Sequence, residues 1–490
     1  MKYFYTFAIP VLLLCAACSD WLDVTPRVQV KETENFTTAQ GFKDALTGVY
    51  MLMTEESCYG RELSFGLTDV LGKQYTTSFG TASEYYYPSI YDYTATASKT
   101  KFATIWRGMY TAIANVNNLI AYVDQADTML FAPDEYHVIR GEAYGLRAFL
   151  HFDLARLFAP AFIVSPDAKA IPYITSFSNQ TTPLVSIRQV IDNALADLSV
   201  AERELKHDPV TRGISSSDYS DYLRNRHYHF NYYAVKLLQA RIYLYKGEHR
   251  PALAAAGEVI AQSLFTWTPE AQIIDANVEA RNYVLSQELI FSLNMNNITE
   301  VAFGSTGFTS WFTMTGTGGF NRSITNWNTV YENTKYGSSD YRYAYLRRDL
   351  SASVVTSNKL YQATTTYGSF INRMPLMRLS EAYFIAAEAS LNLGDKTAAL
   401  DYMNTVREHR NIFDPFPGNL TDSEVQEEIR KEYVKDLICE GQLFFYYKRL
   451  NSETIQFYSP WGANPLARSV YVLPLPDDEL EYGQRYIELE

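Results

Sequence analysis

The residues best suited to contact a ligand are aromatic, and they concentrate in two segments. Residues 84–93 contain five tyrosines, and residues 311–327 begin and end with a tryptophan. The C–H face of a pyranose ring can stack on such side chains, while carboxylate, amide and guanidinium groups hydrogen-bond to hydroxyls. The alternative is that these aromatic rings fill the cores of their loops. The candidate glycan contacts are Glu84, Tyr85, Tyr87, Tyr91, Trp311, Asn321, Arg322 and Trp327.

Signals for catalysis or metal binding are weak by comparison. The sequence has no G-x-S-x-G elbow, P-loop or H-E-x-x-H motif. His227 and His229 could ligate a metal, but no cysteine or carboxylate stands at a diagnostic spacing, so we expect surface histidines. Nothing in the sequence marks a pair of glycosidase carboxylates. We therefore expect a protein that is not an enzyme and that has no cofactor or metal.

The chain is acidic, with 42 Lys+Arg against 55 Asp+Glu and a net charge of −13. An acidic surface repels phosphate backbones, so we do not expect nucleic acid as a partner. A polyanionic glycan would require a local cationic cluster that reverses this field. The sequence offers one weak candidate for such a cluster, formed by Arg342, Arg347 and Arg348.

Aromatic residues are unusually frequent, with 39 Tyr, 27 Phe and 6 Trp in 490 residues. A core can absorb phenylalanine, but each buried tyrosine hydroxyl requires a partner, so part of the excess is expected at a binding surface. Some tyrosines instead follow helical spacing and are expected to pack between helices. These are Tyr110, Tyr144, Tyr233, Tyr243 and Tyr383. The excess therefore supports ligand binding only in the two aromatic segments.

The N-terminus has the pattern of a bacterial lipoprotein signal. Lys2 precedes an apolar run over 4–14, which is too short to span a bilayer, and small residues precede Cys18. Leucine is commoner three residues before a modified cysteine, where this chain has Cys15. We expect a signal peptide over 1–17 and a lipid on Cys18. The alternative is an ordinary secretory signal that happens to contain cysteines.

The remaining cysteines, Cys58 and Cys439, form at most one pair. Two cysteines are too few for a disulfide framework or a zinc site. Outside the signal, no stretch is long and apolar enough to predict a transmembrane helix. We therefore expect a single domain over 18–490, with an N-terminal part to about 265 and a C-terminal part from about 266, tethered by its lipid.

Apolar residues at helical spacing predict most of the scaffold. The predicted helices cover 36–53, 104–124, 133–158, 186–205, 230–246, 251–263, 375–393, 396–409 and 424–451. Two consecutive pairs share small residues for close approach and a glycine in the turn, Gly247 or Gly394. These features are typical of tetratricopeptide-like repeats, which must stack to bury their faces.

The helical pairs alternate with segments of other character. Residues 54–100 and 294–368 are rich in Ser, Thr, Gly and aromatic residues, and we expect long ordered loops there. Strands are predicted at 288–293 and 471–474. The expected fold is mainly α, with tetratricopeptide-like helix pairs in a right-handed superhelical scaffold, long loop regions and a few short β-strands.

Six stretches in this order resemble the SusD/RagB family of outer-membrane lipoproteins from Bacteroidetes. They are the lipid-site sequence 18–26, the helix segment 106–117, the Gly-Glu-Ala segment 141–148, the late helix pair 377–407, the segment 440–449 and the closing segment 473–479. The chain departs from the family pattern at Gln442, where histidine is common, and at Tyr446 and Tyr447, which replace an acidic pattern.

The resemblance implies a function as well as a fold. Members of the family lie on the cell surface over a SusC-like TonB-dependent transporter, capture glycan or in some cases peptide, and pass it on without catalysis. In starch-binding members the ligand contacts come from the loops before the helix at 106–117 and after the central strand. The alternative is a tetratricopeptide-like lid that binds protein or peptide and no glycan. The sequence does not identify the glycan.

Charged residues of the resembling helices are expected to pair within or between helices. They are Glu142, Arg147, Glu381, Glu388 and Arg407. Asn115 and Asn117 are expected to bond helix ends or neighbouring backbone. These side chains would hold the scaffold in register and would not touch ligand.

Overall fold

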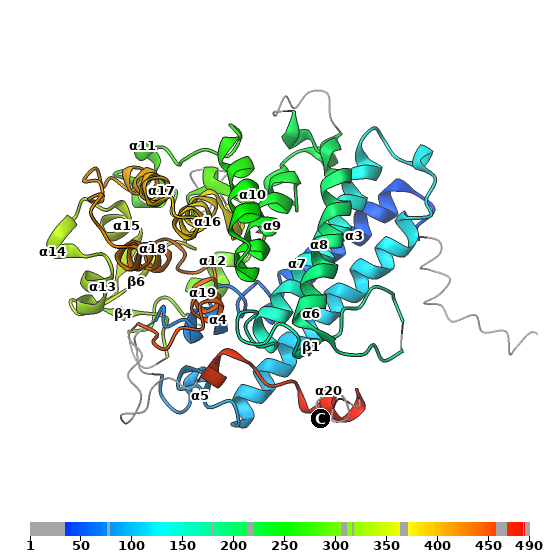
Figure 1. Ribbon diagram of the computed structural model, residues 1–490, viewed down its shortest axis with the longest axis horizontal. Coiled ribbons are helices and arrows are strands. Elements are labelled where there is room, and N and C mark those ends of the chain that lie inside the picture. Colours follow the sequence, from blue (N-terminus) through cyan, green and yellow to red (C-terminus); the bar gives the residue numbers. More distant parts are fainter. Residues whose placement is uncertain are drawn as a thin grey trace, which may run out of the picture.

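Long helices dominate the computed structural model of the chain (Figure 1). The structure describes residues 35–75, 79–178, 180–212, 220–304, 311–315, 318–362, 371–456, 468–483 and 485. Cys18 lies outside these residues, so the predicted lipid site stays a prediction. Among the described residues, no helix combines the length and apolar character that a membrane crossing requires. The predicted mainly helical fold class is confirmed.

Helices that follow one another in the chain pack side by side. The first four long helices are α3 (Ala39–Met53), α6 (Thr96–Val123), α7 (Glu135–Phe158) and α8 (Ile187–Glu204). The next five are α9 (Tyr232–Lys246), α10 (His249–Ala261), α16 (Leu379–Asn392), α17 (Lys396–Glu408) and α18 (Asp422–Asp436). The pairs α9/α10 and α16/α17 are in contact, and α10 packs on α16, so the two predicted repeats stack on one another.

Local sequence explains where several of these helices begin and end. The side chain of Thr38 accepts a hydrogen bond from the Gly41 N–H and so caps α3. Ser186 and Gln189 form a capping box at the start of α8. Gly247 ends α9 with a left-handed φ of 78°, which a glycine adopts without steric cost.

Short elements fill the connections between the long helices. The short helices are α4 (Leu67–Leu71), α5 (Tyr86–Ser89), α11 (Glu270–Ile273), α12 (Ile298–Phe303), α13 (Ile324–Val330), α14 (Asn333–Tyr336), α15 (Tyr341–Ala344), α19 (Leu443–Arg449) and α20 (Asp477–Tyr482). The strands are β1 (Lys169–Ile171), β2 (Val185–Ser186), β3 (Leu289–Asn294), β4 (Arg322–Ser323), β5 (Arg347–Asp349), β6 (Val354–Ser357) and β7 (Arg373–Arg378). They form the antiparallel sheets β1–β2, β3–β7 and β4–β6–β5.

Strand pairing overrides several sequence predictions. The helix predicted from 375 begins at Leu379, because 373–378 forms β7 and pairs with β3, a predicted strand that is confirmed. The region 294–368 is not only loop, since it contains the β4–β6–β5 sheet and short helices. The strand predicted at 471–474 is absent from the described residues, where a 3-10 turn ends at Tyr471. Pairing partners far apart in sequence leave no local signal.

The helix predicted over 424–451 is interrupted between α18 and α19. The backbone N–H groups of Cys439 and Gly441 donate to the Asp69 carboxylate, at 2.7 and 3.2 Å, instead of to helix carbonyls. Gly441 has φ 68°, and a Cβ at this position would lie 2.4 Å from the carbonyl oxygen of Leu63. The close approach of the 54–66 loop therefore requires both the glycine and the break.

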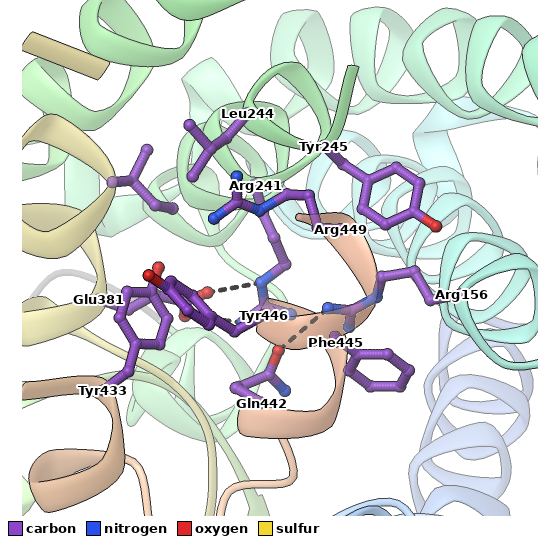
Figure 2. Close-up of a pocket in the computed structure, with 11 residues that line it drawn as sticks. Arg156, Arg241, Leu244, Tyr245, Glu381, Tyr433, Gln442, Phe445, Tyr446 and Arg449 are labelled. Carbon is purple, nitrogen blue, oxygen red and sulfur yellow. Dashed lines mark hydrogen bonds and ion pairs between the residues drawn. The ribbon is translucent and has the colours of Figure 1, made fainter. Parts of the chain in front are cut away.

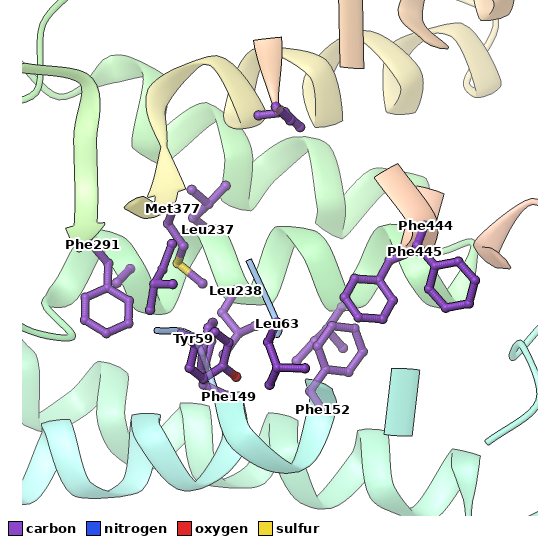
Figure 3. Close-up of a cluster of buried hydrophobic side chains, with 14 of the residues drawn as sticks. Tyr59, Leu63, Phe149, Phe152, Leu237, Leu238, Phe291, Met377, Phe444 and Phe445 are labelled. Carbon is purple, nitrogen blue, oxygen red and sulfur yellow. The ribbon is translucent and has the colours of Figure 1, made fainter. Parts of the chain in front are cut away.

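Hydrophobic side chains from both halves of the chain meet in one large cluster that extends from Phe42 to Leu473. Figure 3 shows a part of it, where side chains from the loop after α3, from α7 and α9, from β3 and β7, and from α19 converge. These residues are Tyr59, Leu63, Phe149, Phe152, Leu237, Leu238, Phe291, Met377, Phe444 and Phe445. The loop after α3 is thus fixed to the helical scaffold by burial.

Four of the five predicted structural charges pair with a partner of opposite charge. Each forms an ion pair at 2.6–2.7 Å: Glu142 with Arg226, Arg147 with Asp197, Glu381 with Arg241, and Glu388 with Arg449. Arg407 instead donates to the Asn404 side chain and the Tyr336 hydroxyl. The amide of Asn115 bonds the helix backbone at Thr111, and that of Asn117 bonds the Ile174 carbonyl. The predicted ion pairing is confirmed for Glu142, Arg147, Glu381 and Glu388, and both asparagines bond backbone as predicted.

A buried network of charges joins β3, β7, α17 and α18. The Asp436 carboxylate, at the end of α18, contacts Arg378, Arg410 and Arg342 at 2.5, 2.8 and 3.3 Å. Glu288 bridges Arg378 and Arg410 at 3.2 and 2.7 Å. All five side chains are buried, so each charge relies on its partners in place of water.

Asp69, in α4, is another buried carboxylate, and it lies against the break between α18 and α19. It accepts the two N–H groups of the α18–α19 break and the hydroxyl of Tyr75 at 3.3 Å. Burial raises the pKa of Asp69 to about 7, although these hydrogen bonds oppose the shift. Its carboxyl group thus titrates near neutral pH in the folded protein.

Asp436→Asn should destabilise the fold strongly, because it leaves three buried guanidinium groups without their common anion. We expect a loss of about 3–5 kcal/mol in unfolding free energy, or failure to fold. Urea unfolding measures it. Glu427→Gln, on the same helix, is the control, since its pair with Arg430 is half exposed and should cost below about 1 kcal/mol. Similar small losses for the two variants would contradict the role of the network.

The stability of the Asp69→Asn variant relative to the wild type should increase as the pH rises from about 4 to 7. The folded pKa of Asp69 is above its ordinary value, so the folded state holds a proton that the unfolded state releases, and stability falls with pH. The difference in melting temperature between variant and wild type measures this at each pH. A difference that is constant over the range would show that Asp69 does not titrate there.

Candidate functional site

The two aromatic segments predicted from the sequence meet in space. The ring of Trp311 stacks on Phe320 at a centroid distance of 4.9 Å and lies edge to face on Tyr85 at 5.2 Å. Tyr85 and Phe320 also contact each other, at 5.2 Å, and both contact Phe79. We call Trp311 with the surrounding charged residues Arg61 and Glu84 the Trp311 platform.

Tyr85 lies under this platform and not on its surface, since its side chain is fully buried. Its hydroxyl donates to the Glu62 carboxylate, at 3.0 and 3.2 Å to the two oxygens. The Lys101 ammonium, from α6, lies 4.3 Å from the ring centroid. Burial and the neighbouring Glu62 charge raise the pKa of Tyr85 well above its ordinary value. Tyr85 therefore supports Trp311 and does not stack on a ligand in this conformation.

Charged side chains lie beside the Trp311 ring. The Arg61 guanidinium lies 5.6 Å from the Trp311 ring centroid and contacts Glu56 at 2.8 Å and Glu62 at 3.0 Å. Glu84 is 41% exposed and contacts Lys101 at 2.5 Å. Trp311 is half-buried. The platform thus offers an aromatic ring beside a donor, Arg61, and an acceptor, Glu84, which is the set that a pyranose can use.

The other tyrosines of the 84–93 segment lie around α5. Tyr86 and Tyr87 are half-buried and pack edge to face at 5.0 Å. The Tyr91 hydroxyl donates to the Leu71 carbonyl at 2.7 Å, and the Lys73 ammonium lies 4.6 Å from its ring. Tyr87 is thus partly exposed to solvent, whereas the Tyr91 hydroxyl is used to hold α4.

The remaining sequence candidates are almost completely buried and do not join the platform surface. Asn321 donates to the Met314 carbonyl at 2.8 Å and shapes the 311–321 loop. Arg322 donates to the Gln74 side chain at 2.7 Å, and burial lowers its pKa to about 10. Trp327, in α13, packs on Tyr331 at 4.7 Å. For these three positions the alternative interpretation, that loop residues fill a core, describes the structure.

Sequence reasoning missed the charged members of the site, Arg61, Glu62 and Lys101. Arg61 and Lys101 both contact Glu62 and Glu84. Arg61 is adjacent to Glu62 in the sequence, but Lys101 is 39 positions from Glu62 and 17 from Glu84, so no short spacing relates Lys101 to its partners. The available signal was local: Arg61 is the one cationic residue of the loop 54–66, and Glu62 follows it directly. Only the packing of that loop on α6 brings them beside Trp311.

Two other sequence expectations are wrong. His227 and His229 are half-buried and not surface residues; burial lowers the pKa of His227 to about 3, and His229 contacts Glu142 at 3.0 Å. The cationic cluster also does not exist as such. Arg342 lies in the buried network of charges, Arg347 contacts Asp349 at 3.2 Å, and Arg348 lies against Phe303 and Tyr361.

Cys58 and Cys439 are buried and do not form a disulfide.

The cavity among the repeat helices is too small for a sugar (Figure 2). It has a volume of about 30 Å³, which accommodates a few water molecules at most. Arg241 and Glu381 line it and pair with each other at 2.7 Å, and Arg156 donates to Gln442 at 3.1 Å. The helical repeats therefore use this polar interior for structure.

A larger hollow, of about 280 Å³, lies between α6 and the segment after β1. Its aromatic residues are Tyr110 and Phe177, and Phe177 is 55% exposed. The Tyr110 hydroxyl is already used, since it donates to the Pro172 carbonyl at 2.8 Å. This hollow is mainly apolar, and its lining contains the serines Ser176 and Ser178 but no charged residue, so it lacks the charged partners found at the Trp311 platform.

Comparison with known families and proteins agrees with this architecture. A family model described as "SusD family" matches residues 294–477, and one described as "Starch-binding associating with outer membrane" matches residues 20–244. SusD-like protein P2 of Formosa agariphila is 25% identical and aligns over 98% of this chain and 97% of its own. SusD-like protein P38 of the same organism is 22% identical, with 97% of each chain covered.

Solved structures show the same fold. A SusD superfamily protein from Bacteroides thetaiotaomicron aligns with a TM-score of 0.70 at 20% identity, over 91% of this chain and 98% of its own. A SusD-like carbohydrate binding protein from Bacteroides vulgatus aligns with a TM-score of 0.68 at 17% identity, over 91% and 97%. The two family models together cover both halves of the scaffold and both aromatic segments. The chain belongs to the SusD/RagB family.

Proposed function

We propose that this protein binds a glycan at the bacterial cell surface and passes it to a SusC-like TonB-dependent transporter in the outer membrane. The observation that carries the proposal is the Trp311 platform, in which an aromatic ring lies beside a cationic donor, Arg61, that is itself 3.7 Å from the exposed Glu84 carboxylate. The family description "Starch-binding associating with outer membrane" and the carbohydrate-binding neighbour from Bacteroides vulgatus support glycan as the ligand class.

The scaffold holds the platform ready for binding. Trp311 packs on Phe320 and Tyr85, and Tyr85 is fixed by Glu62, so the ring does not have to be ordered when a ligand arrives. The role is capture and transfer, without catalysis. The neighbouring carboxylates support this, because the buried Glu62 and the exposed Glu84 share the Lys101 ammonium and Glu56 pairs with Arg61.

The membrane part of the proposal depends on Cys18. A lipid thioether on this residue would anchor the body at the membrane, since buried acyl chains contribute roughly 0.8 kcal/mol per CH₂. The described body contributes no spanning helix, and the proposed anchor is the lipid on Cys18.

Trp311→Ala should abolish glycan binding or weaken it by about tenfold or more, because it removes the stacking surface and leaves the scaffold intact. Affinity electrophoresis against a polysaccharide panel identifies a ligand, and titration calorimetry then gives the dissociation constant. Phe177→Ala is the matched control, an exposed aromatic residue at the other hollow. Loss of binding in Phe177→Ala with full binding in Trp311→Ala would move the site to that hollow, and binding of oligopeptides only would contradict glycan as the ligand.

Cys18→Ser should release the protein from the membrane, because serine cannot form the thioether. Labelling with an alkyne palmitate and membrane fractionation measure the outcome. Cys15→Leu is the control, since it introduces the residue that is commonest at that position and should keep the label. A labelled, membrane-bound Cys18→Ser protein would show that the anchor is elsewhere.

A further inference from the structure

The Arg61 guanidinium at the platform is already surrounded by carboxylates. Its Nη1 contacts Glu56 at 2.8 Å, its Nε contacts Glu62 at 3.0 Å, and its Nη2 lies 3.7 Å from Glu84. Burial opposes the charge of Arg61, but the Tyr85 hydroxyl and these carboxylates outweigh it and raise its pKa above the ordinary value. Arg61 is therefore a compensated cation and not an open anion receptor.

The second cation of the site is compensated in the same way. The Lys101 ammonium contacts Glu62 at 2.8 Å and Glu84 at 2.5 Å. Its side chain is 7% exposed, so a ligand could approach it only by displacing Glu84. Three carboxylates thus face two cations, and the formal charge of the site is −1.

No described cationic cluster offsets this charge elsewhere in the aromatic loops. Arg342, Arg347 and Arg348 are dispersed among a buried network, a carboxylate and two aromatic rings. The whole chain carries −13, which adds a repulsive field for any polyanion. A sulfate or uronate group at the platform would meet an unfavourable local charge and an unfavourable distant one.

We propose that the Trp311 platform selects neutral glycans and rejects glycans that carry sulfate or uronate groups. The inference rests on the proposed function and specifies the ligand class of the same site. A neutral pyranose contributes an apolar face for Trp311 and hydroxyls that both donate and accept. The 3.7 Å separation between Arg61 Nη2 and the Glu84 carboxylate exceeds a normal hydrogen bond. One sugar hydroxyl can bridge it by accepting from Arg61 and donating to Glu84.

The test compares one glycan with its own charged derivatives. The neutral polysaccharide that is retarded most in affinity electrophoresis is chemically sulfated, and a second portion is oxidised to the uronate. We expect both derivatives to bind about tenfold more weakly or worse. Binding of the neutral form should change little between 50 and 500 mM NaCl, because no net charge is neutralised.

A charge variant tests the cause. Glu56→Lys changes the formal charge of the site from −1 to +1 and should reduce the preference for the neutral over the sulfated glycan by about tenfold. Asp167→Lys, an exposed residue before β1, makes the same change in total charge and should leave the preference unaltered. An equal effect of both variants would assign selectivity to the field of the whole protein and overturn the local mechanism.

The outcomes separate this inference from the proposed function. A wild-type protein that binds the sulfated or oxidised derivative as tightly as the neutral glycan, or that binds only acidic polysaccharides, overturns the inference and leaves glycan binding intact. A protein that binds no polysaccharide of either kind overturns both. Unchanged affinity of Trp311→Ala for the neutral glycan overturns the assignment to this platform.

Discussion

The buried network around Asp436 is the constraint on which the arrangement of this protein depends. Asp436 ends α18, Arg378 joins β7 to α16, Arg410 follows α17, and Glu288 precedes β3, so one set of ion pairs fixes the ends of five elements. Removing these charges from water is costly, and only a geometry that satisfies all of them at once compensates for it. The network therefore selects a single packing of the C-terminal repeats against the β3–β7 sheet.

The positions of the side chains in the candidate site depend on that packing. The segment after α18 cannot continue as a helix, because its N–H groups bind Asp69 in α4. Asp69 in turn fixes the loop that carries Arg61 against the end of the scaffold. Trp311 arrives from a different part of the chain and rests on Phe320 and Tyr85. A loop platform can thus be rigid although it has little regular structure, since a charged and aromatic core lies directly under it.

The sequence predicted the helices well and the site only in part. Each of the first eight predicted helices corresponds to an observed one, because apolar stripes and caps such as Thr38 and Ser186 act within a few residues. That Glu381 and Glu388 would each pair with a residue of opposite charge also followed from their places on the helices. In contrast, Asn321, Arg322 and Trp327 could not be distinguished from surface residues, since burial depends on neighbours far away in sequence.

The sequence by itself determined the helical repeats and the two segments in which aromatic residues gather, because these follow from local composition and spacing. The family followed from the resemblance of six stretches to known motifs. Only the tertiary structure decided which aromatic ring is accessible, which charges surround it and where the last long helix breaks. The physical reason is that each of these depends on contacts between distant residues, such as Arg61 with Glu84 and Asp69 with Gly441, whose energies are absent from any short stretch of chain.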